Sequence, residues 1–235
     1  MNWKSRSYEK ELLDEQDVSF RETVQNLKEL ATVNSMLGGH STTLAGLQPF
    51  LKKKYAKPFI IAEIGCGGGD NLRIISKALK AQNIDHRLVG IDLKDECTTF
   101  ARKTNPKLPA DWITSDYRTA NWPQGQKPDV VFSSLFCHHF TDDELVEQLH
   151  WLRANTRLGF FINDLHRHPA AYYSIKALTQ IFSKSRYVKN DGPLSVRRAF
   201  RKAEWKRILE KAGIEKYRIE WRWAFRYLIV VEHGG

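Results

Sequence analysis

Short apolar stretches alternate with longer amphipathic segments through most of the chain beyond Pro58. Five stretches are apolar enough to be strands of a sheet covered on both faces, at positions 59–64, 87–91, 112–115, 129–134 and 158–162. Helical patterns separate most of them, and this alternation is typical of an α/β fold. Two last stretches, 217–223 and 226–232, predict a terminal antiparallel hairpin.

The first quarter of the chain has a helical pattern instead. Positions 20–36 carry apolar residues at helical spacing, and we expect flanking helices at 9–13 and 42–55. Gly38 and Gly39 end the central run. A later helix, 201–212, is closed by Gly213. The pattern therefore predicts an N-terminal helical extension or cap, residues 1–56, before one α/β domain, residues 57–235.

Composition adds limits on the setting. The chain has three scattered cysteines, an odd number that favours neither a disulfide framework nor a paired metal site and fits a reducing cytoplasm. Its apolar runs are too short to span a bilayer, and its first residues are polar, so we expect a cytoplasmic protein without a membrane span. Whether it is a monomer or a homodimer stays open.

The net charge of +10 invites a nucleic-acid partner. However, lysine and arginine are spread along the chain, and the densest stretch, 197–207, has helical spacing with apolar residues between the charges. This spacing favours a solvated helix face over a nucleic-acid footprint, although RNA remains an alternative partner.

A glycine-rich segment carries the sharpest local signal, Glu63-Ile64-Gly65-Cys66-Gly67-Gly68-Gly69-Asp70. It lies between an apolar strand and a helix expected to begin near Asn71. Glycine is required where the backbone turns tightly and lies against a ligand, although glycines also serve plain strand-to-helix turns. The segment alone is therefore weak evidence of a binding loop.

Two carboxylates beyond the loop strengthen that interpretation. Asp92 ends the second predicted strand, and 92 − 69 = 23 residues is near the offset of an acid that binds ribose hydroxyls. Asp116 follows the third strand and points to the same crevice, unless it caps a helix. Asp70 stands where a dinucleotide fingerprint has its third glycine. An acid-rich loop without room for a pyrophosphate suits a sulfonium cofactor that carries an ammonium group.

These residues, with Ser134-Leu135-Phe136-Cys137-His138-His139-Phe140 after the fourth strand, resemble the class I S-adenosylmethionine-dependent methyltransferase family over residues 58–165. The resemblance implies an α/β, Rossmann-like sheet of seven mostly parallel strands, with helices on both faces and a terminal antiparallel hairpin. It implies S-adenosyl-L-methionine as cofactor and S-adenosyl-L-homocysteine as product. The cofactor-binding positions that it implies are Glu63, Gly65, Cys66, Gly67, Gly69, Asp92, Leu93, Asp116, Tyr117 and Ser134.

The segment after the fourth strand is similar to that of small-molecule members, including quinone-type and polyketide-associated O-methyltransferases. A hydroxyl acceptor must lose its proton, and a histidine can take it. The candidates are His139 near the end of the fourth strand and His166 and His168 after the fifth. We favour His166, because Asn163 and Asp164 could orient it. For each histidine the alternative is a hydrogen-bonded structural role.

No metal ion is predicted. Adjacent Cys137, His138 and His139 cannot easily all reach one ion, and Ser133 and Ser134 stand where catechol-type magnesium enzymes supply an acid. The aromatic and aliphatic residues of the insertion, 163–198, predict an apolar substrate lid or, alternatively, a helix that packs on the core. Residues 36–40 would close the other side of the site.

The sequence therefore predicts a methyltransferase that O-methylates a phenolic, quinol or polyketide-like small molecule with an apolar or aromatic part. An RNA methyltransferase is the first alternative, but the Asx-Pro-Pro-aromatic segment of base-amine enzymes is missing at 133–136. A cofactor-binding protein without catalysis is the second. The intact glycines and both acids argue against it.

Overall fold

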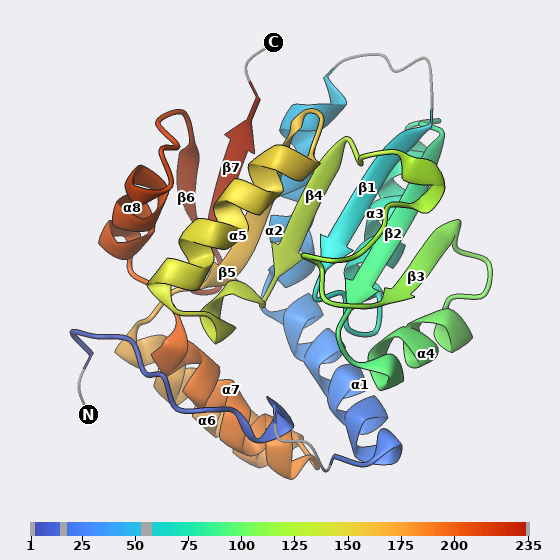
Figure 1. The fold of residues 1–235 in the computed structure, drawn as a ribbon. Helices are drawn as coiled ribbons and strands as arrows, with labels where there is room; N and C mark the ends of the chain where they lie inside the picture. Colours follow the sequence, from blue (N-terminus) through green and yellow to red (C-terminus); the bar gives the residue numbers. More distant parts are fainter. Residues whose placement is uncertain (1–2, 15–17, 53–57, 234–235) are drawn as a thin grey trace.

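The computed structural model describes residues 3–14, 18–52 and 58–233. Its centre is a seven-stranded sheet in the order β3-β2-β1-β4-β5-β7-β6 (Figure 1). β7 pairs antiparallel with both β5 and β6, and the pairs among β1 to β5 are parallel. The predicted Rossmann-like α/β class and the terminal hairpin are confirmed. The strands are β1 Phe59–Ile64, β2 His86–Asp92, β3 Ala110–Thr114, β4 Val130–Ser134, β5 Gly159–Leu165, β6 Arg218–Arg222 and β7 Arg226–Glu232.

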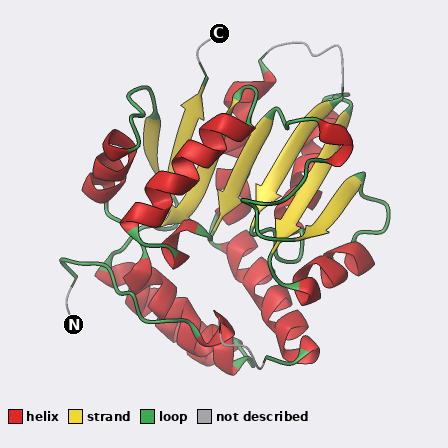
Figure 2. Ribbon diagram, in the orientation of Figure 1, coloured by secondary structure: helices red, strands yellow, loops and turns green. Residues whose placement is uncertain are grey.

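Helices cover both faces of the sheet (Figure 2). In β1, Ile60, Ala62 and Ile64 pack toward α5 and α8, whereas Phe59 and Ile61 pack toward α2 and α3. All six residues of this strand are buried, and this explains why five of them, all except Glu63, are apolar. The helices are α1 Phe20–Met36, α2 Gly39–Leu47, α3 Asp70–Ala81, α4 Asp95–Thr104, α5 Asp142–Asn155, α6 Pro169–Phe182, α7 Arg186–Arg198 and α8 Lys202–Lys211.

The N-terminal quarter departs from the pattern in two places. Helix α1 has the predicted bounds and begins with a capping box between Ser19 and Glu22. The next helix begins earlier than expected, because Gly38 adopts a left-handed conformation with φ of 73° that reverses the chain directly into α2. It ends at Leu47, before the short 3-10 turn η2 Gln48–Leu51. The predicted end at 55 and the domain boundary at 56 lie outside the described residues.

The helix expected at 9–13 is only a short 3-10 turn, η1 Leu12–Asp14. The chain before it runs along α7, where the Ser7 amide donates to the Arg197 carbonyl at 3.0 Å. The Leu12 and Leu13 amides donate to the Asp191 carboxylate of α7. We call residues 3–14 the N-terminal strap.

The carboxyl ends of the parallel strands meet at one edge of the sheet, at the bottom of Figure 1. Helices α1, α6 and α7 and the N-terminal strap lie beyond this edge (Figure 1). The insertion after β5 is therefore a pair of packed helices that faces the strand ends. Among the described residues, no helix is long and apolar enough to cross a bilayer.

Candidate functional site

A cavity of about 710 Å³ lies at the carboxyl edge of the sheet. The glycine loop and the strand ends form one wall, and α1, the α6–α7 pair, the N-terminal strap and the β6–β7 turn form the others. Most of its lining side chains are apolar, and its volume is in the range of sites for small molecules. Segments distant in the sequence thus enclose one space.

The glycine loop forms the wall nearest the sheet. Gly65 and Gly67 line the cavity, with φ of 67° and 50°. A Cβ at Gly65 would lie 2.3 Å from the Phe136 ring, so a side chain cannot be added without moving that ring. Both positions require glycine for their backbone conformation, and Gly65 requires it for space as well.

Asp92 connects the loop to the second strand. Its carboxylate accepts hydrogen bonds from the Gly67 amide at 2.9 Å and from the Lys94 amide at 3.0 Å. Burial raises the pKa of Asp92, and these two amides act against that rise. The side chain lines the cavity beside Leu93, which is 73% exposed. The Asp92 carboxylate, which accepts hydrogen bonds, therefore lies beside the exposed apolar side chain of Leu93.

Asp116 and Tyr117 lie at the end of the third strand and also line the cavity. Arg118 donates to both carboxylate oxygens of Asp116, through Nε at 3.1 and 3.0 Å and Nη2 at 2.5 Å. This contact holds the pKa of Asp116 below its usual value. Tyr117 is buried and packs edge-on against Phe136.

Four predicted cofactor residues lie behind this wall and do not line the cavity: Glu63, Cys66, Gly69 and Ser134. Glu63 is buried and accepts a hydrogen bond from Asn71 at 2.8 Å. Burial raises its pKa well above the ordinary value. Gly69 has φ of 73°, and a Cβ there would meet Trp112 at 2.3 Å. Glu63 and Gly69 thus take part in packing that holds the loop.

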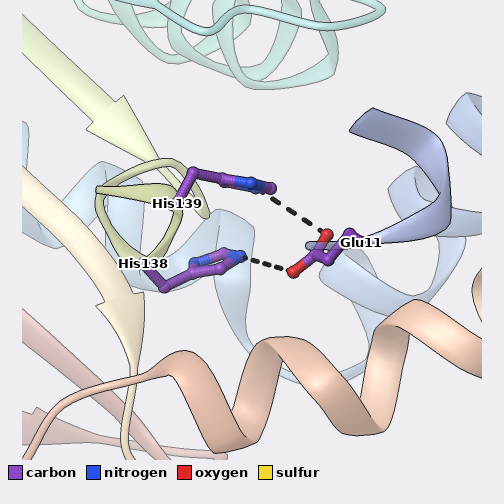
Figure 3. Close-up of side chains that lie close together, drawn as sticks. All are labelled: Glu11, His138 and His139. Carbon is purple, nitrogen blue, oxygen red and sulfur yellow. Dashed lines mark ion pairs between the residues drawn. The ribbon is translucent and has the colours of Figure 1, made fainter. Parts of the chain in front are cut away.

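Three titratable side chains gather at another part of the cavity wall (Figure 3). His138 and His139 lie in the 3-10 turn after β4, and Glu11 comes from the N-terminal strap. His138 Nε2 is 3.6 Å from Glu11 Oε1, and His139 Nε2 is 3.9 Å from Glu11 Oε2. The structure therefore brings one predicted histidine, His139, together with two residues that were not predicted.

His138 is held from its other ring nitrogen. Nδ1 lies 2.8 Å from Asp164 Oδ1 at the end of β5, and both side chains are buried. Burial acts to raise the pKa of Asp164, but the charge and hydrogen bond of His138 hold it below the usual value. Asp164 is therefore ionised at neutral pH, so Nδ1 donates and Nε2 faces Glu11.

His166 and His168 do not line this cavity. His166 is half-buried, and its Nδ1 has no hydrogen-bond partner among the described residues. Burial and the neighbouring His168, Arg201 and Arg167 lower its pKa to about 4, which makes it a weak base. His168 accepts a hydrogen bond from the Ala170 amide and so caps α6.

The sequence contained a partial signal for the residues that we missed. The residue pair expected to orient His166 is engaged elsewhere, because Asp164 binds His138 and Asn163 donates to the Gly39 carbonyl. We call the 3-10 turn Cys137–His139 the histidine turn. A carboxylate at the end of β5, next to this turn after the neighbouring strand β4, indicates an Asp–His pair. Glu11 carried no signal, because only long-range folding brings the N-terminal strap to the site.

A family model described as a methyltransferase domain matches residues 61–189, more than half of the chain. No curated protein gives a significant match to the sequence.

Solved methyltransferases share the fold. The plantazolicin methyltransferase BpumL, in complex with SAH, has a TM-score of 0.62 at 18% identity, over 90% of this chain and 94% of that one. Human N-acetylserotonin methyltransferase, in complex with SAM, has a TM-score of 0.64 at 16% identity, over 92% and 57%. Magnesium protoporphyrin IX methyltransferase from Synechocystis, with bound SAH, has a TM-score of 0.56 at 13% identity, over 94% and 90%.

Proposed function

The chain belongs to the methyltransferase domain family, and on this premise we propose that it transfers the methyl group of S-adenosylmethionine to a hydroxyl oxygen of a small molecule. One observation carries the proposal. A single cavity is lined both by the glycine loop with Asp92 and by the His138–His139 pair. Donor and acceptor can therefore meet in one space.

The cofactor occupies the wall nearest the sheet in this proposal. Gly65 and Gly67 allow close approach of its methionine and ribose parts, and Asp92 accepts from the ribose hydroxyls. Asp116 and Tyr117 flank the adenine. Because Arg118 occupies both Asp116 oxygens, a hydrogen bond from the adenine amino group requires Arg118 to shift or share. The similar structures with bound SAM or SAH support this choice of cofactor.

Methyl transfer requires little beyond positioning and removal of one proton. The acceptor oxygen loses its proton and attacks the methyl carbon in line with the sulfur, and the sulfur keeps the bonding electron pair. The leaving group departs as a neutral thioether and needs no acid. A phenolic hydroxyl, with a pKa of about 10, therefore benefits from a basic group at the acceptor site.

We place the acceptor hydroxyl beside His138 and His139, and we retain His139 from the sequence prediction. His138 replaces His166 and His168 as the first candidate base, because it lines the cavity and Asp164 orients it. Asp164 acts through His138 and is a positioning residue.

The substrate class follows from the other walls. Residues of α1, α6 and α7 such as Leu30, Ile175, Leu178 and Val196 line the cavity, and they suit the apolar body of a phenolic, quinol or polyketide-like acceptor. In this role the α6–α7 pair is the substrate lid and α1 belongs to the N-terminal cap. The names of the similar enzymes contain three different acceptors, so the fold does not select one.

No observation favours RNA as the acceptor. The basic stretch 197–207 is used within the protein, because Arg197 pairs with Glu9, Arg207 pairs with Asp142, and Arg198 donates to backbone carbonyls of the histidine turn. These contacts leave less of its charge for phosphates.

A methyl-transfer assay tests the proposal. We would incubate the protein with S-adenosylmethionine labelled in its methyl group and a panel of phenols, quinols and aliphatic amines. We expect the label on oxygen. We also expect His138→Asn to reduce kcat by about a hundredfold or more and to retain binding of S-adenosylhomocysteine. The control is His150→Asn on the exposed side of α5, which should retain full activity. Transfer to amines alone, or an unchanged kcat in His138→Asn, would contradict the proposal.

A further inference from the structure

We propose that Glu11, His138 and His139 bind one divalent transition-metal ion at the acceptor site. The inference rests on the proposed function only for what the ion does to the acceptor, and not for its binding. The sequence predicted no metal site, because three consecutive side chains cannot easily all reach one ion and no acid follows the fourth strand at Ser133 and Ser134. The structure changes that argument, since the third group comes from another segment of the chain (Figure 3).

The ligand atoms have the spacing of a metal site. One atom from each of the three residues lies within 4.8 Å of the other two. The distances from His138 Nε2 and His139 Nε2 to the Glu11 carboxylate oxygens, 3.6 Å and 3.9 Å, are close to the separation of about 3 to 3.5 Å that ligands have when each lies about 2.1 Å from one ion. A small inward movement of side chains would complete the coordination.

The outer hydrogen bonds are those of metal-bound histidines. Asp164 lies 2.8 Å from His138 Nδ1, and Asp14 lies 3.3 Å from His139 Nδ1. A carboxylate at the second ring nitrogen fixes the tautomer of a metal-binding histidine and raises its basicity. Here two carboxylates do so for two adjacent histidines.

Both rings are directed at one carboxylate. With a carboxylate at each Nδ1, His138 and His139 both direct Nε2 toward Glu11. An ion between the two nitrogens and the Glu11 carboxylate would be within reach of all three groups. Glu11 is itself buried and fixed, because Ser195 donates to its Oε1 at 2.7 Å.

Cys137 does not belong to this donor set. Its thiol is buried and directed to Gln148 Oε1 at 3.2 Å. Two imidazoles and one carboxylate favour zinc, iron, cobalt or manganese over magnesium, which prefers oxygen ligands and retains its waters. Three protein ligands also leave coordination positions for the acceptor, as in catalytic metal sites.

The ion would act on the acceptor hydroxyl. An oxygen bound to it ionises more readily, and the proton leaves to solvent before the oxygen attacks the methyl carbon. His138 then holds the ion and does not serve as the base.

The test is a metal titration of the full chain after removal of metals with a chelator. We expect calorimetry to show one Zn²⁺ per chain at micromolar or tighter affinity and no binding of Mg²⁺. Glu11→Gln and His139→Asn should each weaken Zn²⁺ binding at least tenfold. The matched control, His150→Asn, should bind as the wild type does. Co²⁺ should give visible absorption bands that are lost in both site variants.

A parallel titration with S-adenosylhomocysteine separates the two proposals. If the metal-free protein and both site variants bind it, they are folded and the cofactor site stands. If Zn²⁺ binding is then absent, or equal in the wild type and both site variants, the ion proposal is wrong and His138 remains the candidate base. If metal binding follows the prediction but S-adenosylhomocysteine does not bind, the proposed function fails and the metal site stands.

Discussion

Gly65 and Gly213 share a left-handed backbone, with φ of 67° and 64°, but their surroundings differ. A Cβ at Gly65 would lie 2.3 Å from Phe136 beside the proposed cofactor site, whereas nothing lies within 4 Å of a Cβ at Gly213. We predict that Gly65→Ala lowers the affinity for S-adenosylhomocysteine at least tenfold. Gly213→Ala should cost about 1 kcal/mol of folding free energy and leave binding unchanged. Calorimetry and urea unfolding would measure these effects. Equal affinities in the two variants would contradict the steric argument.

His166 gives a prediction for stability against pH. Burial and nearby positive groups lower its folded-state pKa to about 4, below the value of 6.5 expected when unfolded. Its contribution is therefore complete above pH 6.5 and is lost as the pH falls toward 4. Because the ring is only half-buried, we expect about 1 to 2 kcal/mol. In urea unfolding at pH 7.5 and pH 5, His166→Leu should lose less stability than the wild type. Equal losses would show that His166 does not contribute.

At the scale of single residues, the sequence predicted those cavity-lining positions that the local backbone conformation fixes. Gly65, Gly67, Asp92, Leu93, Asp116 and Tyr117 all line the cavity, because a strand-to-helix turn and the strand ends fix their positions. The histidines were predicted less well. Which imidazole Asp164 reaches depends on the pairing of β4 with β5 and on the turn after β4, and this could not be derived from proximity in the chain.

The N-terminal strap is the element that most changes the site. Arg6 holds the N-terminal strap against the rest of the protein. Its buried guanidinium donates to three backbone carbonyls and forms an ion pair with Asp142; the carbonyls are those of Arg198, His138 and Phe140. The strap in turn carries Glu11 to the histidine turn. Its position therefore decides whether the proposed metal site exists.

We predict that Arg6→Ala destabilises the protein by about 2 to 4 kcal/mol, because buried acceptors lose their donor. Hydrogen exchange should increase in the strap and in the 3-10 turn Cys137–His139 more than in β1. Arg218→Ala is the control. Its ion pairs with Glu220 and Glu232 are exposed, and their loss should change stability by about 1 kcal/mol or less. Faster exchange spread evenly over the sheet would argue against a local fastening role.

Strands and most helices were predictable because burial imposes a pattern on them. β1 is apolar except for Glu63, and α1 begins with a capping box that the pair Ser19 and Glu22 encodes. The N-terminal strap has neither signal. It is irregular, and its conformation depends on hydrogen bonds to α7, nearly two hundred residues away in the sequence. Propensity could not predict it.

At the scale of the molecule, the cavity is a product of the whole fold. Its lining runs from Glu11 to Arg226 in the sequence, and the buried Arg226 donates to Asn34 of α1 and Asn163 of β5. Burial lowers the pKa of Arg226 to about 10, so the group stays charged at neutral pH. Because the cavity exists only when these segments are folded together, a ligand that binds in it should stabilise the whole protein and raise its melting temperature.

The central claim is that the glycine loop and Asp92 bind S-adenosylmethionine and its product. Calorimetric titration of the purified protein with S-adenosylhomocysteine tests it most directly, with NADH as a second ligand. Asp92→Ala is the site variant, and Asp111→Ala, an exposed acid on β3, is its matched control. We predict micromolar binding with one site per chain, lost in Asp92→Ala and retained in Asp111→Ala. Absence of binding, or tighter binding of NADH, would contradict the account.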